Sequence, residues 1–212
     1  GFPHFGHNEE TAWCITHGMA DDTDLFVEGK DLDQVEWEIE TLKVRGEGEF
    51  EVYCGSTERG PVVIGDPTDK IALSLAWTGL VGRDTTFDSL LPMLKASNCN
   101  ELEDAVEPWV IPVNNMLSAD TQGHISFKIR GRVIERAAAN RWIPVPGEAA
   151  TPWTELEPVT FDELPGITDP PEGYLVTANN RTSNSGPYIS LDFAGPARYD
   201  RISELLAPLT AA

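Results

Sequence analysis

Residues 1–28 read GFPHFGHNEETAWCITHGMADDTDLFVE. Two apolar runs in this stretch, residues 11–17 and 25–28, have the composition of β-strands. Between them lies a short segment that ends in an acidic cluster at residues 21–24. The stretch therefore predicts a strand, an acidic turn and a second strand.

The rest of the chain continues as short elements cut by glycine and proline. Residues 34–45 alternate in part, with Val35, Trp37 and Ile39 on one face, as in a half-buried strand. Further strands or hairpins are predicted at residues 46–66, 71–79, 110–133 and 173–180. Helical spacing is found at residues 88–96, at 101–109 behind an Asn100 cap, and at 197–211. These proportions predict an α+β fold with mostly antiparallel sheets flanked by helices.

A proline-rich segment at about residues 143–173 interrupts the series of strands. Trp153, Phe161 and Leu164 punctuate this segment, and a flexible linker would lack such apolar anchors. We therefore expect an ordered surface excursion within a single domain that spans residues 1–212.

The composition argues against several classes of protein. The chain has 35 acidic and 15 basic residues, for a net charge of −20, and nucleic-acid phosphates would require a basic surface. The sequence contains no run of 18 apolar residues, so we expect no membrane span. Cys14, Cys54 and Cys99 are widely spaced, with neither a CxxC motif nor zinc spacing, so a single disulfide stays possible.

A series of motifs, taken in order, resembles the penicillin acylase family of N-terminal-nucleophile hydrolases. The motifs are PHFGHNEETAWCITHGMADDTDLFVE, RGPVV, AWTGL, IPVNNMLSADTQGHISFKIRGRV, IPVPG, WTELEPVTFDELP, DPPEGYLVTANNR and ARYDRISELL. Each motif alone is weak, whereas the ordered series from about residue 2 to residue 206 is specific. The resemblance implies part of an αββα sandwich. It also implies hydrolysis of a linear amide, such as a β-lactam side chain, an N-acyl homoserine lactone or another N-acyl compound.

The family's mature β chain begins with a catalytic serine upstream of the equivalent of Phe2, whereas residue 1 here is glycine. We therefore expect an internal fragment of a β chain that is inactive by itself. Its expected partners are the α chain and the remainder of the β chain of the same precursor, with a small N-acyl compound as substrate. The resemblance also implies a periplasmic or secreted parent protein.

Three residues would contribute to catalysis by this resemblance. In the family the serine attacks the amide carbonyl while its α-amine, with a pKa near ~8, accepts the proton. The side-chain amide of Asn179 and the backbone N–H of His17 would then stabilise the oxyanion. Arg198 would orient the Asn179 carbonyl and keep the terminal amine neutral. Asn180 and Arg201 are the alternatives, and without the resemblance these positions are a turn residue and a surface salt bridge.

The acidic cluster resembles the family's calcium site, because hard oxygen ligands at close spacing suit Ca²⁺. The expected ligands are the carboxylates of Asp21, Asp24 and Asp192 and the carbonyls of Thr23 and Arg141. Without the resemblance, the cluster would be interpreted as a solvated acidic turn.

His4 and Met19 fall where the family lines its acyl pocket. His4 there would suit a polar or carboxylate-bearing acyl group, and the equal alternative is a solvated histidine at the edge of a fragment. Two other functions stay open from the sequence. One is a non-catalytic, calcium-stabilised acidic binding or interaction module, which the charge and the absent nucleophile suggest. The other is a sugar-binding β-rich domain, which predicts that some of the six tryptophans are exposed in a groove.

Overall fold

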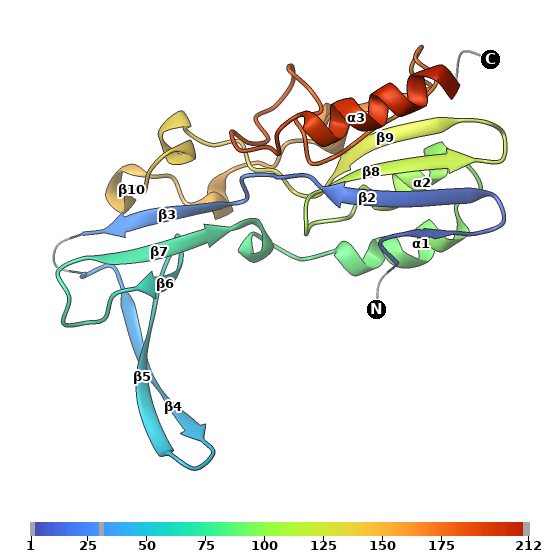
Figure 1. Ribbon diagram of the computed structural model, residues 1–212. Helices are drawn as coiled ribbons and strands as arrows, with labels where there is room; N and C mark the ends of the chain where they lie inside the picture. The colour runs from blue at the N-terminus through green and yellow to red at the C-terminus, as the bar shows by residue number, and fades with distance from the viewer. Residues whose placement is uncertain (1–2, 30–31, 210–212) are drawn as a thin grey trace. The chain divides into compact units, whose positions relative to one another are not determined.

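The computed structural model describes residues 3–29 and 32–209 (Figure 1). These residues form two compact units, each with its own β-sheet. Unit 1 contains the described residues of 1–21, 83–133 and 158–212, and unit 2 contains those of 22–82 and 134–157. The two strands predicted near the start of the chain therefore belong to different sheets.

Unit 1 is built on a five-stranded antiparallel sheet in the order β1-β2-β8-β9-β11. Its strands are β1 (Gly6–His7), β2 (Thr11–His17), β8 (Asn114–Asp120), β9 (Ile125–Arg130) and β11 (Gly166–Thr168). The hairpin predicted within residues 110–133 is confirmed as β8 and β9. Its turn contains Gly123 with φ of 95°, a conformation that glycine adopts without steric cost. β2 pairs with β8 along its whole length and ends with His17 opposite Asn114.

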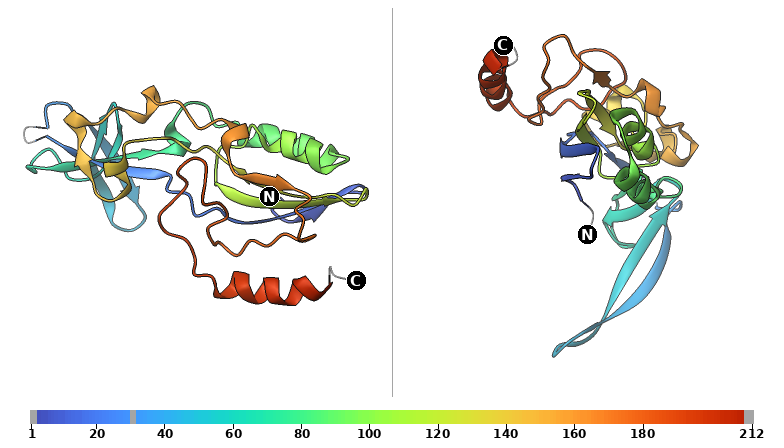
Figure 2. Two further views of the ribbon diagram at one scale, coloured as in Figure 1. Left: turned by 90° about the horizontal axis from the view of Figure 1, so that it is seen from above. Right: turned by 90° about the vertical axis from the view of Figure 1, so that its right-hand side faces the viewer.

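Helices lie on both sides of the unit 1 sheet (Figure 2, left). α1 (Leu90–Lys95) and α2 (Cys99–Val106) belong to one side, and α3 (Ala197–Leu206) lies on the other. The buried core on the α1 and α2 side includes Trp13, Met93, Leu102, Val106 and Met116. The helix predicted near the C-terminus is confirmed as α3, but Ile202 and Leu205 on it are 39% and 55% exposed.

Two predictions for unit 1 are wrong in detail. The N-cap of α2 is Asn98 and not Asn100, because the Asn98 side-chain oxygen accepts a bond of 2.9 Å from the N–H of Glu101. Residues 173–180 do not form a strand. Leu175 in this segment packs against a buried cluster of unit 1, so its apolar pattern marked burial and not strand pairing.

Unit 2 is built on a six-stranded sheet in the order β10-β3-β7-β6-β5-β4. Its strands are β3 (Thr23–Glu28), β4 (Glu36–Val44), β5 (Gly48–Thr57), β6 (Gly60–Ile64), β7 (Ala72–Trp77) and β10 (Val145–Pro146). β10 runs parallel to β3, and the other pairings are antiparallel. The predicted acidic turn is too long, because Thr23 and Asp24 pair with Trp77 and Ala76 inside this sheet.

The proline-rich residues 143–173 carry apolar anchors into a core of each unit. Trp153 is buried with Phe26 in unit 2, and Leu164 is buried with Phe127 in unit 1. Short 3₁₀ turns separate the anchors along this segment. Each anchor removes apolar surface from water, which stabilises an ordered path for this proline-rich segment.

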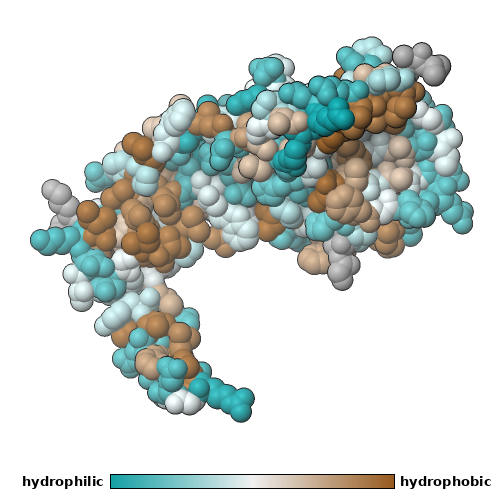
Figure 3. Space-filling view, in the orientation of Figure 1, coloured by the Kyte–Doolittle hydropathy of each residue, from teal (hydrophilic) through white to brown (hydrophobic). Residues whose placement is uncertain are grey.

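β4 and β5 form a long two-stranded hairpin, which we call the β4–β5 arm (Figure 1). β6 pairs with β5 only at Ser56 and Thr57, so most of the arm extends beyond the rest of the sheet. The predicted half-buried face holds for Val35 and Trp37 but is wrong for Ile39, which is 58% exposed. Figure 3 shows apolar residues on the surface of this arm.

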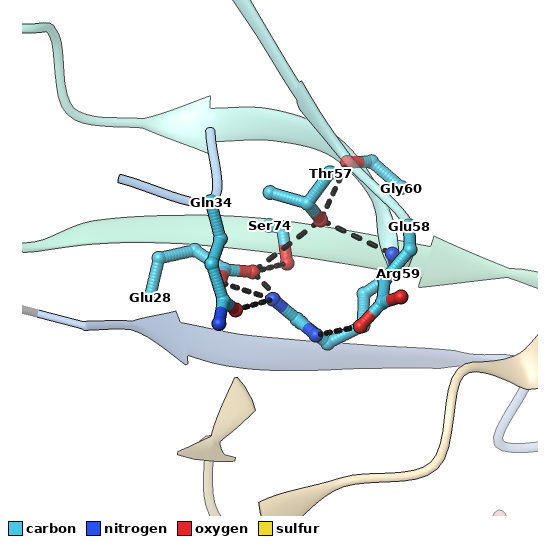
Figure 4. Close-up of polar contacts among 7 residues, drawn as sticks. All are labelled: Glu28, Gln34, Thr57, Glu58, Arg59, Gly60 and Ser74. Carbon is cyan, nitrogen blue, oxygen red and sulfur yellow. Dashed lines mark hydrogen bonds and ion pairs between the residues drawn. The ribbon is translucent and has the colours of Figure 1, made fainter. Parts of the chain in front are cut away.

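A buried ion pair joins the base of the arm to the centre of the unit 2 sheet (Figure 4). Arg59, in the turn between β5 and β6, donates to Glu28 of β3 through Nε at 3.1 Å and Nη2 at 2.7 Å. Ser74 of β7 and Thr57 of β5 also donate to Glu28 Oε1. Burial raises the pKa of Glu28, but the hydrogen bonds from Arg59 and Ser74 more than offset it, so the pKa lies below its ordinary value.

Candidate active site

The end of β2 presents His17 in a tightly fixed backbone. The N–H of Gly18 donates to the carbonyl of Val113 at 3.0 Å, and a Cβ at Gly18 would lie 3.0 Å from that oxygen. Alternate residues of an antiparallel strand turn their N–H groups to opposite sides, so the N–H of His17 points away from β8. Met19 follows with φ of 57°, and its N–H donates to His17 Nδ1 at 3.0 Å. The chain therefore turns sharply at Met19, and the bonds of Gly18 and Met19 hold the His17 peptide in place.

Asn179 lies beside His17, although the two are 162 positions apart in the sequence. Its Nδ2 donates to the carbonyl oxygen of His17 at 3.0 Å. Asn179 has φ of 61°, in the left-handed region that costs a residue other than glycine about 1–3 kcal/mol. Its own carbonyl accepts a bond of 2.8 Å from the N–H of Ala194, which helps to hold this strained backbone.

Arg198, at the start of α3, fixes the other end of the Asn179 side chain. Its Nη2 donates to Asn179 Oδ1 at 3.0 Å and to the carbonyl of Ala178 at 2.7 Å. Because the Oδ1 is held, the amide nitrogen of Asn179 must face the opposite way. The predicted trio of Asn179, His17 and Arg198 is therefore assembled in unit 1.

The two alternative positions form other contacts. Asn180 turns back on its own segment, where its Oδ1 accepts from the N–H of Ala178 at 2.9 Å. Arg201 pairs with Glu204 of the same helix at 3.1 Å on the surface. Neither side chain shares the contacts that connect Asn179 to His17.

Asn115 also belongs to this site, and the sequence analysis missed it. Its Nδ2 lies 3.3 Å from the His17 carbonyl oxygen and 3.1 Å from Thr16 Oγ1, and Thr16 in turn donates to Thr177 Oγ1. Asn115 is buried in the middle of the sheet. The available signal was the polar pair Asn114-Asn115 at the start of an otherwise apolar strand.

The arrangement can bind a negatively charged oxygen. A side-chain amide carries two N–H groups, so the one that Asn179 gives to the His17 carbonyl leaves a second for a ligand. The amide does not titrate, and it is held at both ends before any ligand arrives. A donor that is oriented in advance stabilises developing charge without reorganisation.

The two residues predicted to line an acyl pocket, His4 and Met19, lie outside the strands of the unit 1 sheet. His4 lies just before β1 and is exposed, whereas Met19 follows β2 and is half-buried. Of the six tryptophans, Trp13, Trp109 and Trp153 are buried, whereas Trp142 is 73% exposed.

The expected calcium ligands are divided between the units. Asp21 and Asp192 belong to unit 1, whereas Thr23, Asp24 and Arg141 belong to unit 2. In unit 1, Asp21 Oδ2 accepts from the hydroxyl of Tyr188 at 2.9 Å.

In unit 2, one oxygen of the Asp24 carboxylate is bonded to neighbouring side chains. Its Oδ2 forms an ion pair of 2.8 Å with Arg136 Nε and accepts bonds of 3.1 Å from Asn140 and Trp153. In the part of the chain that the structure describes, no three His, Cys, Asp or Glu side chains are grouped to hold a metal ion. Calcium binding therefore stays a prediction.

Comparison with known proteins identifies the relatives of the chain. A model of the penicillin amidase family matches residues 1–212. The chain is 36% identical over 220 residues to penicillin acylase 2 proenzyme of Pseudomonas sp. (strain SE83), covering 97% of the chain and 28% of that relative. It is 26% identical over 217 residues to acyl-homoserine lactone acylase QuiP of Pseudomonas putida, covering 94% of the chain and 26% of that relative.

The fold has a solved counterpart. A thermostable penicillin G acylase from Alcaligenes faecalis matches with a TM-score of 0.76 and 24% identity, over 93% of this chain and 39% of that one. This likeness and the two mainly antiparallel sheets confirm the α+β class. No helix within the described residues is long and apolar enough to cross a bilayer. The family match over 212 residues, together with 36% identity to one member, shows that the chain belongs to the penicillin amidase family.

Proposed function

We propose that the protein to which these residues contribute is an amidohydrolase that cleaves the linear amide of a small N-acyl compound. The observation that supports this proposal is the 3.0 Å bond from Asn179 Nδ2 to the His17 carbonyl oxygen, which brings the Asn179 amide to the His17 peptide. In this proposal the nucleophile is an N-terminal serine outside residues 1–212. The role of this chain is to hold the oxyanion.

The proposed reaction begins when the serine hydroxyl oxygen bonds to the amide carbonyl carbon and the serine α-amine takes the hydroxyl proton. The carbonyl oxygen becomes an oxyanion, which accepts bonds from Asn179 Nδ2 and from the N–H of His17. The C–N bond then breaks, the departing amine takes the proton, and an acyl-serine ester remains for hydrolysis by water. Arg198 acts as a positioning residue, because it orients the Asn179 amide before charge develops.

Two substrate classes fit this reaction, and the names of the relatives support both. One relative is a penicillin acylase at 36% identity, and another is an acyl-homoserine lactone acylase at 26% identity. We propose the acyl side chain of a penicillin as the preferred substrate, since the higher identity belongs to the penicillin acylase.

The test uses the complete protein that carries these residues and the serine. Asn179→Ala should lower kcat by roughly 10²–10³-fold on a penicillin or an N-acyl homoserine lactone, because one oxyanion donor is lost, with KM little changed. Asn180→Ala is the matched comparison, since that side chain bonds to the N–H of Ala178 and the carbonyl of Arg181 in its own segment. Undiminished hydrolysis by Asn179→Ala would remove the oxyanion role, and a larger loss in Asn180→Ala would transfer it to Asn180.

We also propose that the complete protein binds a structural Ca²⁺ ion through the acidic cluster. The support is the oxygen chemistry of the expected ligands, which are the carboxylates of Asp21, Asp24 and Asp192 and the carbonyls of Thr23 and Arg141, because Ca²⁺ prefers such ligands.

A further inference from the structure

Arg130, the last residue of β9, carries a guanidinium that the proposed mechanism does not use. Its side chain is 0% exposed, inside the core of unit 1. The guanidinium lies over the ring of Trp109 at 3.8 Å, and Nη1 is 3.7 Å from Met93 Sδ and 4.0 Å from Met116 Sδ. A guanidinium carries a charge and five N–H donors that an apolar side chain of the same size lacks, so its position relative to the candidate active site bears on what it does.

The strand register places Arg130 in line with the candidate active site. Asn114 of β8 is the pairing partner of Arg130 on one side and of His17 on the other. Arg130 Nη2 donates to Asn114 Oδ1 at 3.4 Å. With neighbouring strands about 4.8 Å apart, the row from Arg130 to His17 spans about 10 Å.

Asn114 and Asn115, at the start of β8, contact Arg130 and His17 on opposite faces of the sheet. Successive residues of a strand point to opposite faces. Asn114 faces the core and contacts Arg130, whereas Asn115 faces the other way and donates to the His17 carbonyl. The His17 peptide is thus backed by a buried guanidinium on the face opposite Asn179.

We propose that Arg130 is a positioning residue of the oxyanion site, which anchors Asn114 opposite His17 and places a positive charge behind the two donors. This inference rests on the proposed function for its effect on the rate, but not for its effect on the backbone. Burial lowers the pKa of Arg130 to about 9, so the guanidinium is still protonated at neutral pH. The strand spacing puts the backbones of Arg130 and His17 about 10 Å apart, and a unit charge at a distance of that order, with an effective dielectric constant of about 20, changes a rate by roughly tenfold.

The kinetic test compares Arg130→Met with Arg130→Lys in the complete protein. Arg130→Met should lower kcat about tenfold with KM unchanged, and Arg130→Lys should recover most of the loss because it restores the charge. Lys128→Met is the matched control. Lys128 is a buried cation on the same strand and face, but it pairs with Glu103 and lies in the row of Met116 and Ile15. An unchanged kcat in Arg130→Met, while Asn179→Ala is impaired, would overturn the proposal.

A second readout does not depend on activity. Hydrogen exchange of the Gly18 N–H, which bonds to Val113, should accelerate about tenfold or more in Arg130→Met but not in Lys128→Met. If Asn179→Ala hydrolyses its substrate normally, the proposed oxyanion role fails. The exchange rate of the Gly18 N–H still shows whether Arg130 positions the backbone at His17. Where Arg130→Met does not fold, Asn114→Ala replaces it, with the same two expected changes. Unchanged exchange and unchanged kcat in Asn114→Ala would overturn the proposal.

Discussion

Asn179 is a residue whose backbone is strained and whose side chain is held at both ends. Its φ of 61° is unfavourable for asparagine by about 1–3 kcal/mol, and Arg198 and Ala194 bond to its two oxygens. Strain that neighbouring contacts enforce is common where a side chain must be aimed. A turn residue that served only to reverse the chain would not need an arginine on its side-chain oxygen.

Glu28 and Arg59 present a different case, since their buried ion pair supports the fold and not the site. Glu28→Gln should lower the free energy of unfolding by about 3 kcal/mol at pH 7, because Arg59 then loses its buried partner and keeps only the ion pair with the exposed Glu58. Replacing both, as Glu28→Leu with Arg59→Met, should cost less than Glu28→Gln alone. Urea denaturation measures the free energy of unfolding of the single and the double variant.

The exposed pair of Arg201 with Glu204 is the control for this prediction. Glu204→Gln should change the free energy of unfolding by less than about 1 kcal/mol.

The same pair predicts how stability depends on pH. The pKa of Glu28 is lower in the folded protein than in the unfolded chain, so its contribution is fully present above the unfolded value. The contribution is lost as the pH falls through the lowered folded value. The difference in unfolding free energy between wild type and Glu28→Gln should therefore shrink on acidification below about pH 4. A difference that stays constant from pH 7 to pH 3 would contradict the assignment.

At the scale of elements, the β4–β5 arm is the least supported part of unit 2. Ile39, Leu42, Phe50 and Tyr53 on it are exposed, and an isolated two-stranded ribbon is only marginally stable. Replacing residues 41–51 by Asn-Gly, a sequence that favours tight hairpin turns, should change the free energy of unfolding by less than about 1 kcal/mol. The contrast is Trp37→Ala at the base of the arm, where Trp37 packs against a buried cluster with Val35. That substitution should cost about 2 kcal/mol or more in urea denaturation.

The elements that the sequence predicts well are those whose pattern and pairing agree. β2, β8 and β9 were predicted from their apolar runs and pair as antiparallel neighbours, and the turn between β8 and β9 contains the glycine that its conformation needs. Residues 173–180 have the apolar content of a strand but bond through side chains, and pattern alone does not separate these cases. The candidate active site is likewise not predictable from local sequence pattern alone. The contact of Asn179 with His17 is a long-range one that the family resemblance predicted, whereas the polar pair Asn114-Asn115 did not by itself indicate that Asn115 reaches the His17 carbonyl.

At the scale of the whole chain, the dominant property is the net charge of −20. Repulsion among these charges destabilises a compact state, and salt screens it over a Debye length of about 10 Å at 0.1 M. The melting temperature should therefore rise with NaCl, and Mg²⁺ should raise it as any divalent cation does. Specific Ca²⁺ binding adds a separate term, because a ligand that binds only the folded state stabilises it by about 2.7 kcal/mol at 100 times its Kd.

The calcium prediction is tested by comparing Ca²⁺ with Mg²⁺ at equal ionic strength. A specific site should raise the melting temperature by several degrees more in Ca²⁺ than in Mg²⁺, since about 1 kcal/mol corresponds to roughly 2–4 °C for a chain of this size. Asp21→Asn should abolish the difference, because it removes one expected carboxylate ligand. Asp162→Asn, at an exposed acid far along the sequence, should leave it intact. Equal effects of the two ions would assign the acidic cluster to general charge screening, because screening depends on ionic charge and not on coordination geometry.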